Sequence, residues 1–429
     1  MDLFSAFEQQ LKQTTAQHYL IALSGGLDST VLLTLFAKLR QIQPHFHLRA
    51  IHIHHGLSPN AGSWVEHCRS LCAQYEIPFI IEKVQIDYRN GIEAGAREAR
   101  YQAILRHIQA NEILVTAHHL NDQTETFFLA LKRGSGLQGL GAIQKHSELF
   151  GMKIFRPLLS FTREQLEHYA HTEHLTWVYD ESNDDTRYER NFLRNEILPK
   201  LRERWTYIDH TVQRAAQHCF EQQQLINELL QETFLEHCQT PTEFQLHQFN
   251  QYSSPKQTAL LRMWLSQNQW EMPSKRQLEQ LINDVVLAKK EANPQFHLGK
   301  QIVRRYQSYL YLTADFADLT GICLEMQNNR LLLPDNLGEL HLQRTPQHFI
   351  FSWQQFSVEL PPTDLPIQIR FGYSGKIKHH PKRPREDIKK IWQELGVPPW
   401  QRSRIPLIFY GDQLQSAVGF FKVFEHSEK

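Results

Sequence analysis

The residues best suited to chemistry form one short run near the start of the chain, Leu23-Ser24-Gly25-Gly26-Leu27-Asp28-Ser29. Because Gly25 and Gly26 lack a Cβ atom, the backbone can turn tightly there and direct successive N–H groups at an anion. Ser24 and Ser29 add hydroxyl donors, and a helix that starts at this point adds its positive end. Asp28 would repel a phosphate, so we expect it to bind Mg²⁺ or to begin the helix. The run predicts a phosphate-binding loop.

Other nucleotide-binding patterns fit this run poorly. The chain has no G-x-x-x-x-G-K-[ST] sequence, which excludes an ordinary P-loop NTPase. The run itself does not follow the G-x-G-x-x-G spacing of dinucleotide-binding turns. The alternative is a glycine-rich turn that only joins a strand to a helix. Two serines and an aspartate in register favour phosphate binding.

Two carboxylates, Asp122 and Glu125, lie three residues apart where a helix is expected to start. Residues at this spacing share a helix face, so the pair could hold amines, and one member could help to remove a proton. The alternative is that both charges only complement the helix dipole.

Four arginines accompany these motifs along the chain: Arg97, Arg100, Arg190 and Arg194. A guanidinium makes planar, bidentate contacts with phosphate or carboxylate, so these side chains could stabilise charge on a phosphoryl group. The alternative is a set of surface ion pairs with the neighbouring acids Glu93, Glu98 or Glu189.

Histidines and cysteines do not predict a metal centre. The pairs His54-His55 and His118-His119 follow predicted strands, and adjacent residues there point to opposite sides, so nucleotide contact or packing is favoured over zinc. The five cysteines are odd in number and form no C-x-x-C pair. Cys68 and Cys72, four residues apart on a predicted helix, are expected to be a buried thiol pair.

The elements that must position these residues alternate along the first two hundred positions. Short apolar runs at 19–24, 48–54, 79–84 and 113–117 predict strands buried on both faces. Amphipathic patterns at 29–42, 63–74, 93–108, 124–132 and 163–174 predict helices. This alternation predicts an α/β fold with a doubly wound, mainly parallel sheet, and ligands at the carboxyl ends of its strands.

Three domains are expected, because 429 residues exceed the size of one hydrophobic core. We predict a catalytic domain at 1–207, a mostly helical substrate-binding domain at 208–340, and a small α+β domain at 341–429. Residues 208–290 show no convincing strand, 296–312 are β-like, 331–366 hold short strand candidates, and 385–395 predicts a helix.

Charge is unevenly distributed although the chain has 46 basic and 46 acidic residues. The zero sum excludes a uniformly basic nucleic-acid binder. Residues 341–429, however, contain thirteen bases against eight acids, and a second basic cluster lies at 187–204. Bases neutralise phosphates and aromatic rings stack on unpaired nucleotides, so we expect RNA contacts from Lys376, Lys382, Arg383, Arg385, Trp400 and Arg402. The alternative is a solvated basic surface.

No secretory signal and no membrane span are expected. The first twenty residues carry charges and glutamines, and no apolar stretch reaches the roughly 20 residues that span a bilayer. We therefore expect a cytoplasmic protein without a membrane partner.

These motifs resemble a known superfamily. The Ser-Gly-Gly-x-Asp-Ser run is similar to the signature of the PP-loop (N-type) ATP pyrophosphatases, which cleave ATP between its α and β phosphates and adenylate a second substrate. Further blocks, taken in order, resemble the tRNA(Ile)-lysidine synthetase family: Ile53-His54-His55-Gly56-Leu57, EAGAREARY at 93–101, TAHHLNDQTET at 116–126, KRGSG at 132–136, RPLL at 156–159, Trp177 with Asp180, Ser182 and Asn183, and RNFLR at 190–194. The specific motifs cover about 20–200, and PPWQR at 398–402 extends a weaker match.

The resemblance implies a function. The family uses ATP with Mg²⁺ and free L-lysine to convert the wobble cytidine of an isoleucine tRNA with a CAU anticodon into lysidine, through an adenylated cytidine. It implies Arg97 and Arg190 near the reaction centre, Asp122 and Glu125 at the amino acid, and ATP contacts from Ile53, His54 and His118. Asn121 departs from the family, which usually has aspartate there, so a direct ligand role for this position is in doubt.

Alternatives to this function remain. Another PP-loop enzyme could thiolate a tRNA cytidine, but the cluster-dependent form needs C-x-x-C cysteines that the chain lacks. A small-molecule amidating synthetase would not need the basic C-terminal segment, and a non-catalytic RNA-binding protein would not need Asp28, Asp122 and Glu125. The oligomeric state is open, and a homodimer is one alternative.

Overall fold

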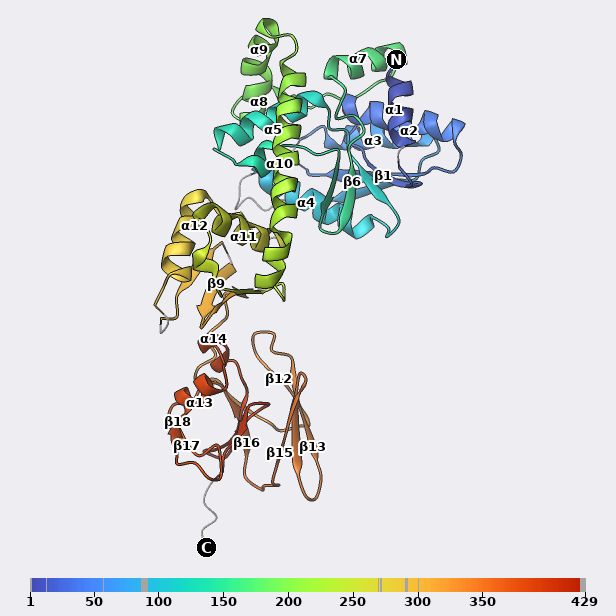
Figure 1. The fold of residues 1–429 in the computed structure, drawn as a ribbon. Helices are drawn as coiled ribbons and strands as arrows, with labels where there is room; N and C mark the ends of the chain where they lie inside the picture. Colours follow the sequence, from blue (N-terminus) through green and yellow to red (C-terminus); the bar gives the residue numbers. More distant parts are fainter. Residues whose placement is uncertain are drawn as a thin grey trace. The chain divides into compact units, whose positions relative to one another are not determined.

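The computed structural model describes residues 2–424 except 13, 57, 86–91, 269, 271, 290–291 and 300, and only the backbone of 92–94. The chain divides into two compact units, Met1–Glu228 and Leu229–Lys429. The division falls inside the long helix α10 (Ile208–His237), shown in Figure 1. Domain boundaries at 207 and 340 remain a prediction.

The first unit is built on a six-stranded sheet of order β3-β2-β1-β4-β6-β5. Its strands are β1 (His18–Ala22), β2 (His47–His54), β3 (Phe79–Lys83), β4 (Ile113–Val115), β5 (His146–Leu149) and β6 (Met152–Phe155). All neighbours pair in parallel except the edge strand β5. The predicted doubly wound sheet and its first four strands are confirmed, whereas the β5–β6 hairpin was not predicted.

Helices cover both faces of this sheet, and the alternation along β1 shows why. Tyr19 and Ile21 pack into one core cluster with α1 (Leu3–Leu11) and α2 (Leu27–Ile42). Leu20, between them, packs into the opposite cluster with α4 (Ile92–His107). Successive strand residues point to opposite faces, so an apolar run without alternation must be covered on both sides.

The order of the strands locates a crevice. The chain leaves β1 through α2 to β2 and through α3 (Ala61–Gln74) to β3, and α4 then returns it to β4 on the other side of β1. After β1 the chain continues toward one edge of the sheet, and after β4 it continues toward the other edge. A crevice therefore forms between the carboxyl ends of β1 and β4, and ligands bind in such crevices in folds of this kind. The phosphate loop follows β1, and α5 (Leu120–Lys132) follows β4.

Four shorter helices and a last long one complete the described part of the unit. These are α6 (Leu137–Leu140), α7 (Arg163–Thr172), α8 (Glu189–Phe192), α9 (Leu198–Arg204) and the first part of α10, with a 3₁₀ turn at Glu181–Asp184 and a π-helical turn at Leu193–Ile197. The predicted buried thiols are confirmed, since Cys68 and Cys72 on α3 are both buried and unbonded to each other.

The second unit begins with helices and continues with strands. Helices α11 (Ser254–Gln267) and α12 (Lys275–Leu281) accompany a sheet of order β7-β10-β9-β8, formed by β7 (Glu243–Gln245), β8 (Gln295–Leu298), β9 (Gln301–Tyr306) and β10 (Tyr309–Ala314). We predicted no strand in 208–290, and β7 corrects this. It is three residues long and is held by pairing with the distant β10, which local sequence does not reveal.

The C-terminal part contains two further antiparallel sheets and a two-stranded ladder. One sheet has the order β11-β16-β19-β20-β21 and the other β12-β13-β14-β15, while β17 pairs with β18. The bounds are β11 Cys323–Glu325, β12 Arg330–Leu332, β13 Glu339–Arg344, β14 Phe349–Trp353, β15 Phe356–Leu360, β16 Ile367–Arg370, β17 Lys376–Ile377, β18 Glu386–Asp387, α13 Ile388–Glu394, α14 Pro399–Arg402, β19 Leu407–Tyr410, β20 Gln413–Ala417 and β21 Phe421–Lys422. Within the described ranges no helix is long and apolar enough to cross a bilayer.

Candidate active site

The phosphate loop is closed by its own hydroxyl groups. The Ser29 hydroxyl accepts from the Gly25 N–H at 3.1 Å and lies 3.0 Å from the Ser24 hydroxyl. Ser24 in turn accepts from the Gly26 N–H at 3.4 Å. Both serines are thus placed beside the backbone amides that the sequence predicted would face an anion. Ser24 is exposed, so an incoming phosphate can reach the outer side of the loop.

Gly25 is required by both conformation and space. Its φ of 89° lies in the left-handed region, and a Cβ atom there would stand 2.9 Å from Cys68 Sγ and 3.1 Å from a Val178 methyl group. The Val178 N–H also donates to the Gly25 carbonyl at 2.9 Å. The loop is therefore packed between α3 and the segment that precedes the Glu181–Asp184 turn.

Asp28, on the first turn of α2, has one carboxylate oxygen that is buried and makes no hydrogen bond within the described chain. Its other oxygen lies 3.6 Å from His119 Nε2, and the same nitrogen lies 3.5 Å from Asp122 Oδ2. His119 therefore joins the phosphate loop after β1 to the helix after β4. The sequence favoured His118 for this region, but the structure places its neighbour between the two acids.

The start of α5 is fixed by a capping box. The Asp122 carboxylate accepts from the His119 backbone N–H at 3.0 Å, and His119 Nδ1 accepts from the Asn121 N–H at 3.2 Å. Asp122 thus has the helix-start role that we set beside the functional one, and it also faces the site. The buried Asn121 accepts from the Arg163 N–H at 3.0 Å, so this position stabilises the beginning of α7.

Glu125 is nearly inaccessible and is held by arginine. Arg194 donates from Nε to Glu125 Oε1 at 2.7 Å and from Nη2 to Oε2 at 2.9 Å, and Nη2 also reaches Asp122 Oδ1 at 3.3 Å. Arg190 Nε lies 3.5 Å from Glu125, and its Nη2 donates to Thr126 Oγ1 at 3.0 Å. Neither Arg190 nor Arg194 forms the surface ion pair with Glu189 that was the alternative from the sequence. Glu189 instead pairs with Lys132 at 2.6 Å.

These charges separate the proton affinities of the two acids. Burial acts to raise the pKa of Asp122, but the facing charges of His119 and His118 and a backbone N–H outweigh it, bringing that pKa to about 2. For Glu125, burial and the charge of Asp122 raise the pKa although Arg194 opposes them. One carboxylate is therefore firmly ionised, whereas its neighbour has the higher affinity for a proton, which suits a proton acceptor.

A short irregular helix aims the two arginines at Glu125. Arg190 lies on α8 and Arg194 on the π-helical turn that follows, so side chains four residues apart point the same way. Asn191, between them, donates to the Ser182 and Asp185 carbonyls at 2.8 and 3.0 Å, which anchors the segment. Such π turns are frequent at functional sites.

A second buried ion pair, which sequence reasoning missed, orients α5 from behind. Asp209 at the start of α10 accepts from Thr124 Oγ1 at 2.6 Å and from Arg202 Nε at 2.8 Å. Thr124 lies within the site motif, between Asp122 and Glu125, but its partner is 85 residues away. No local signal marks Asp209, because an acid near a helix start is common.

The remaining predicted residues of the first unit lie around this centre. The Arg97 guanidinium lies over the Tyr101 ring at 5.0 Å, and Arg100 Nη2 is 3.5 Å from His55 Nε2. His118 Nδ1 bonds Thr116 Oγ1 at 2.8 Å, and burial, helped by neighbouring arginine charges, lowers the His118 pKa to about 4. Ile53 and His54 end β2, beside β1 in the sheet. Their nucleotide contacts remain a prediction.

The predicted RNA contacts in the second unit differ in their surroundings. Lys376, Lys382, Arg383 and Arg385 are exposed, although Arg383 pairs with Glu394 at 2.9 Å. Trp400 instead packs against the Tyr311 ring at 5.3 Å, and Arg402 donates to the Val397 carbonyl at 2.9 Å. The four exposed basic residues make neither of these two contacts, so they are better candidates for phosphate contact than Trp400 and Arg402.

Comparisons with known proteins agree with this geometry. A PP-loop domain model matches residues 2–201, a TilS substrate binding domain model matches 244–311, and a TilS substrate C-terminal domain model matches 367–429. The fold and site therefore define a PP-loop enzyme of the ATP-using class.

Relatives along the full length narrow this class. The tRNA(Ile)-lysidine synthase of Haemophilus influenzae (strain PittGG) is 71% identical, over 99% of this chain and 100% of that protein. That of Actinobacillus succinogenes is 55% identical over 99% and 100%. The chain belongs to the tRNA(Ile)-lysidine synthase family. A solved U34-tRNA thiolase from Methanococcus maripaludis aligns with 51% of this chain and 77% of its own, at 16% identity and a TM-score of 0.42, too low to support an argument.

Proposed function

We propose that this enzyme ligates L-lysine to C2 of the wobble cytidine of an isoleucine tRNA with a CAU anticodon, in the cytoplasm, with ATP cleaved to AMP and pyrophosphate. The observation that supports it most is the joining of the phosphate loop to the acidic start of α5 through His119, 3.6 Å from Asp28 and 3.5 Å from Asp122. The cytidine would lie at this contact, between the bound ATP and the amine nucleophile.

The first step would be attack of the cytidine O2 on the α-phosphorus of ATP, which displaces pyrophosphate and leaves the base activated at C2. The Ser24 and Ser29 hydroxyls would bind the phosphates, together with the Gly25 and Gly26 amides once these no longer donate to the serines. Arg97 and Arg190 would stabilise the developing negative charge, as guanidinium groups do in phosphoryl transfer.

Asp28 fits a Mg²⁺ ligand. Its buried Oδ1 has no hydrogen-bond donor among the described residues, and Mg²⁺ in nucleotide sites is commonly held by one or two carboxylates together with phosphate oxygens. A bound Mg²⁺ would neutralise charge on the polyphosphate. Asp28 would hold it, and His119 would keep the carboxylate oriented.

The second step would be attack of a lysine amine on C2, with loss of AMP. Asp122 and Glu125 would hold the ammonium groups of lysine. At Glu125 the lysine would either share the carboxylate with Arg194 or replace Arg194. Glu125, whose pKa burial raises, is the better acceptor for the amine proton. The exposed bases Lys376, Lys382 and Arg385 would hold the tRNA backbone.

The function is tested by incubating the enzyme with radiolabelled lysine, ATP–Mg²⁺ and two tRNA transcripts that differ only in C or U at the wobble position. We expect acid-precipitable lysine on the C-bearing tRNA alone. Absence of transfer to it, under conditions where the enzyme binds ATP, would contradict the proposal. Equal transfer to both transcripts would contradict its cytidine specificity.

A further inference from the structure

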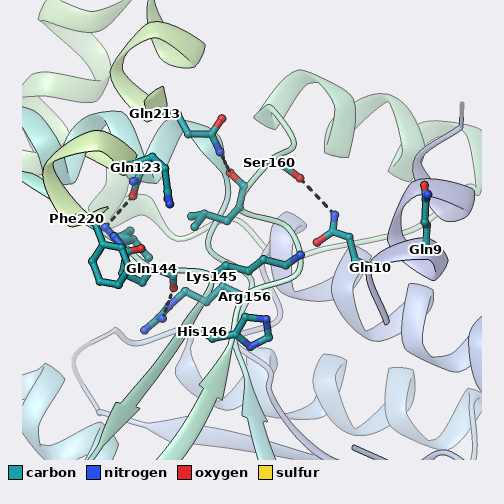
Figure 2. A pocket seen from close by; sticks show the side chains of 13 residues that line it. Gln9, Gln10, Gln123, Gln144, Lys145, His146, Arg156, Ser160, Gln213 and Phe220 are labelled. Carbon is teal, nitrogen blue, oxygen red and sulfur yellow. Dashed lines mark hydrogen bonds between the residues drawn. The ribbon is translucent and has the colours of Figure 1, made fainter. Parts of the chain in front are cut away.

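The first unit contains a cavity of about 810 Å³ to which the phosphate loop contributes no residue. Its walls come from α1, from Gln123 on α5, from the α10 face that carries Gln213 and Phe220, and from the segments that lead into β5 and out of β6 (Figure 2). This volume lies within the range of about 300–1,000 Å³ that is typical of ligand pockets. The cavity is therefore large enough for a nucleotide.

The cavity is lined by an unusual number of amides. Six glutamines contribute: Gln9, Gln10, Gln123, Gln144, Gln213 and Gln217. Four of them donate their NH₂ group to the protein, Gln10 to Ser160 at 3.3 Å, Gln144 to the Gly141 carbonyl at 2.6 Å, Gln213 to the Leu159 carbonyl at 3.4 Å and Gln217 to Glu221 at 2.9 Å. Their carbonyl oxygens are then left to accept, which favours a base with an exocyclic amino group.

The cavity is also positively charged. Lys145 and Arg156 line it, and none of the described lining residues is acidic. Arg156 is only 6% exposed, and its Nε atom is buried with no hydrogen-bond partner in the described chain, while Nη1 donates to the Gln144 carbonyl at 2.7 Å. A buried cation without a counter-charge is costly, so an anion is the expected complement.

An aromatic ring completes the set. Phe220 lies on the same wall as Gln213 and Gln217, because residues three, four and seven apart share a helix face, and Figure 2 shows its ring beside Gln144. A half-buried ring of this kind provides a surface on which a base can stack.

The cavity adjoins the candidate active site. Gln123 follows Asp122 on α5, and the charge of Arg156 acts on His118, whose pKa it helps to lower. We propose that the cavity binds one unpaired nucleotide of the RNA substrate other than the reacting cytidine, with its base among the glutamines and Phe220 and its phosphate at Lys145 and Arg156. The identity of the RNA rests on the proposed function, whereas the nucleotide chemistry rests on the cavity itself.

Two experiments on the full chain test this. First, a photoreactive p-benzoylphenylalanine at the exposed position 217 is irradiated with an anticodon stem-loop RNA or with free AMP and CMP. We expect a crosslink to one loop nucleotide next to or near the wobble base. A crosslink to free nucleotide but not to RNA, or no crosslink at all, would overturn the assignment to RNA.

Second, the Lys145→Gln/Phe220→Leu variant is compared with Lys12→Gln, an exposed lysine on the surface after α1. We expect the double variant to bind the stem-loop at least tenfold more weakly, with ATP affinity unchanged, and Lys12→Gln to bind normally. Unchanged RNA affinity in the double variant refutes the cavity proposal even if lysine transfer occurs. Loss of RNA affinity in an enzyme that transfers no lysine leaves the cavity proposal standing and removes only the proposed reaction.

Discussion

Arg194 holds Glu125 with two parallel hydrogen bonds, at 2.7 and 2.9 Å, across 69 residues of sequence. The Glu125 side chain is 1% exposed, so its charge depends on this partner rather than on water. The same guanidinium reaches Asp122, and a cation therefore already lies where the amine of a lysine substrate is expected. The acidic pair therefore binds a cation of the protein itself, the Arg194 guanidinium.

The first prediction concerns this pair. Arg194→Met leaves Glu125 buried without its closest cation, and we expect the free energy of unfolding to fall by about 3 kcal/mol, the low end for a broken buried pair because Arg190 still lies 3.5 Å away. Urea unfolding measures this. The control is Arg187→Met, which removes an exposed ion pair with Asp185 and should leave the urea midpoint almost unchanged. Equal losses in both variants would contradict the assignment.

The second prediction concerns Gly25. A Gly25→Ala substitution adds a Cβ atom 2.9 Å from Cys68 Sγ at a left-handed φ, so the phosphate loop has to move. We expect ATP affinity to fall at least tenfold. Gly134→Ala is the matched control, since Gly134 has a φ of 66° with open space around its Cβ direction and should lose only about 1 kcal/mol of stability. Normal ATP binding by Gly25→Ala would rule out this loop geometry.

The third prediction concerns acid sensitivity. The folded state holds the pKa of His118 at about 4, below its ordinary 6.5. The unfolded chain therefore takes up this proton at higher pH, so stability is lost as the pH falls from about 6.5 to about 4. His118→Asn should lose less stability across this window, measured by urea unfolding at several pH values. An NMR titration that gave His118 a pKa of 6.5 or above would contradict the prediction.

The fourth prediction separates phosphate contact from packing in the second unit. Lys382→Ala/Arg385→Ala removes two exposed bases, and we expect weaker tRNA binding with a salt slope smaller by about 2. Lys275→Ala, which removes a 90% exposed lysine elsewhere in this unit, should leave the slope unchanged. Trp400→Ala should mainly destabilise the unit, because its ring packs on Tyr311. An unchanged slope in the double variant would exclude both bases from the RNA interface.

Much of this molecule could be predicted from local patterns, and the rest depends on distant pairing. The first four strands were recognisable because each is a short apolar run between turns, and the phosphate loop because its spacing is specific. The partner of Thr124 was not recognisable, since Asp209 is 85 residues away, nor was the pairing of β7 with β10. His118 and His119 are adjacent, and only the backbone at the start of α5 decides which ring faces Asp28.

The cavity illustrates the same limit. Nothing in the local sequence indicates that Gln213 would line the same space as Arg156 and Gln10. Five separate segments form that space, at 9–10, 123, 143–146, 156–160 and 213–220, and only the tertiary fold brings them together.

The central claim is that this site activates the tRNA and not the lysine, and exchange of radiolabelled pyrophosphate into ATP tests it most directly. The enzyme is supplied with ATP–Mg²⁺ and labelled pyrophosphate, together with C-bearing tRNA alone, lysine alone, or neither. We predict that tRNA alone supports exchange, because the adenylated cytidine forms reversibly before lysine reacts. Exchange that requires lysine and proceeds without tRNA would contradict the account, since the enzyme would then adenylate the amino acid.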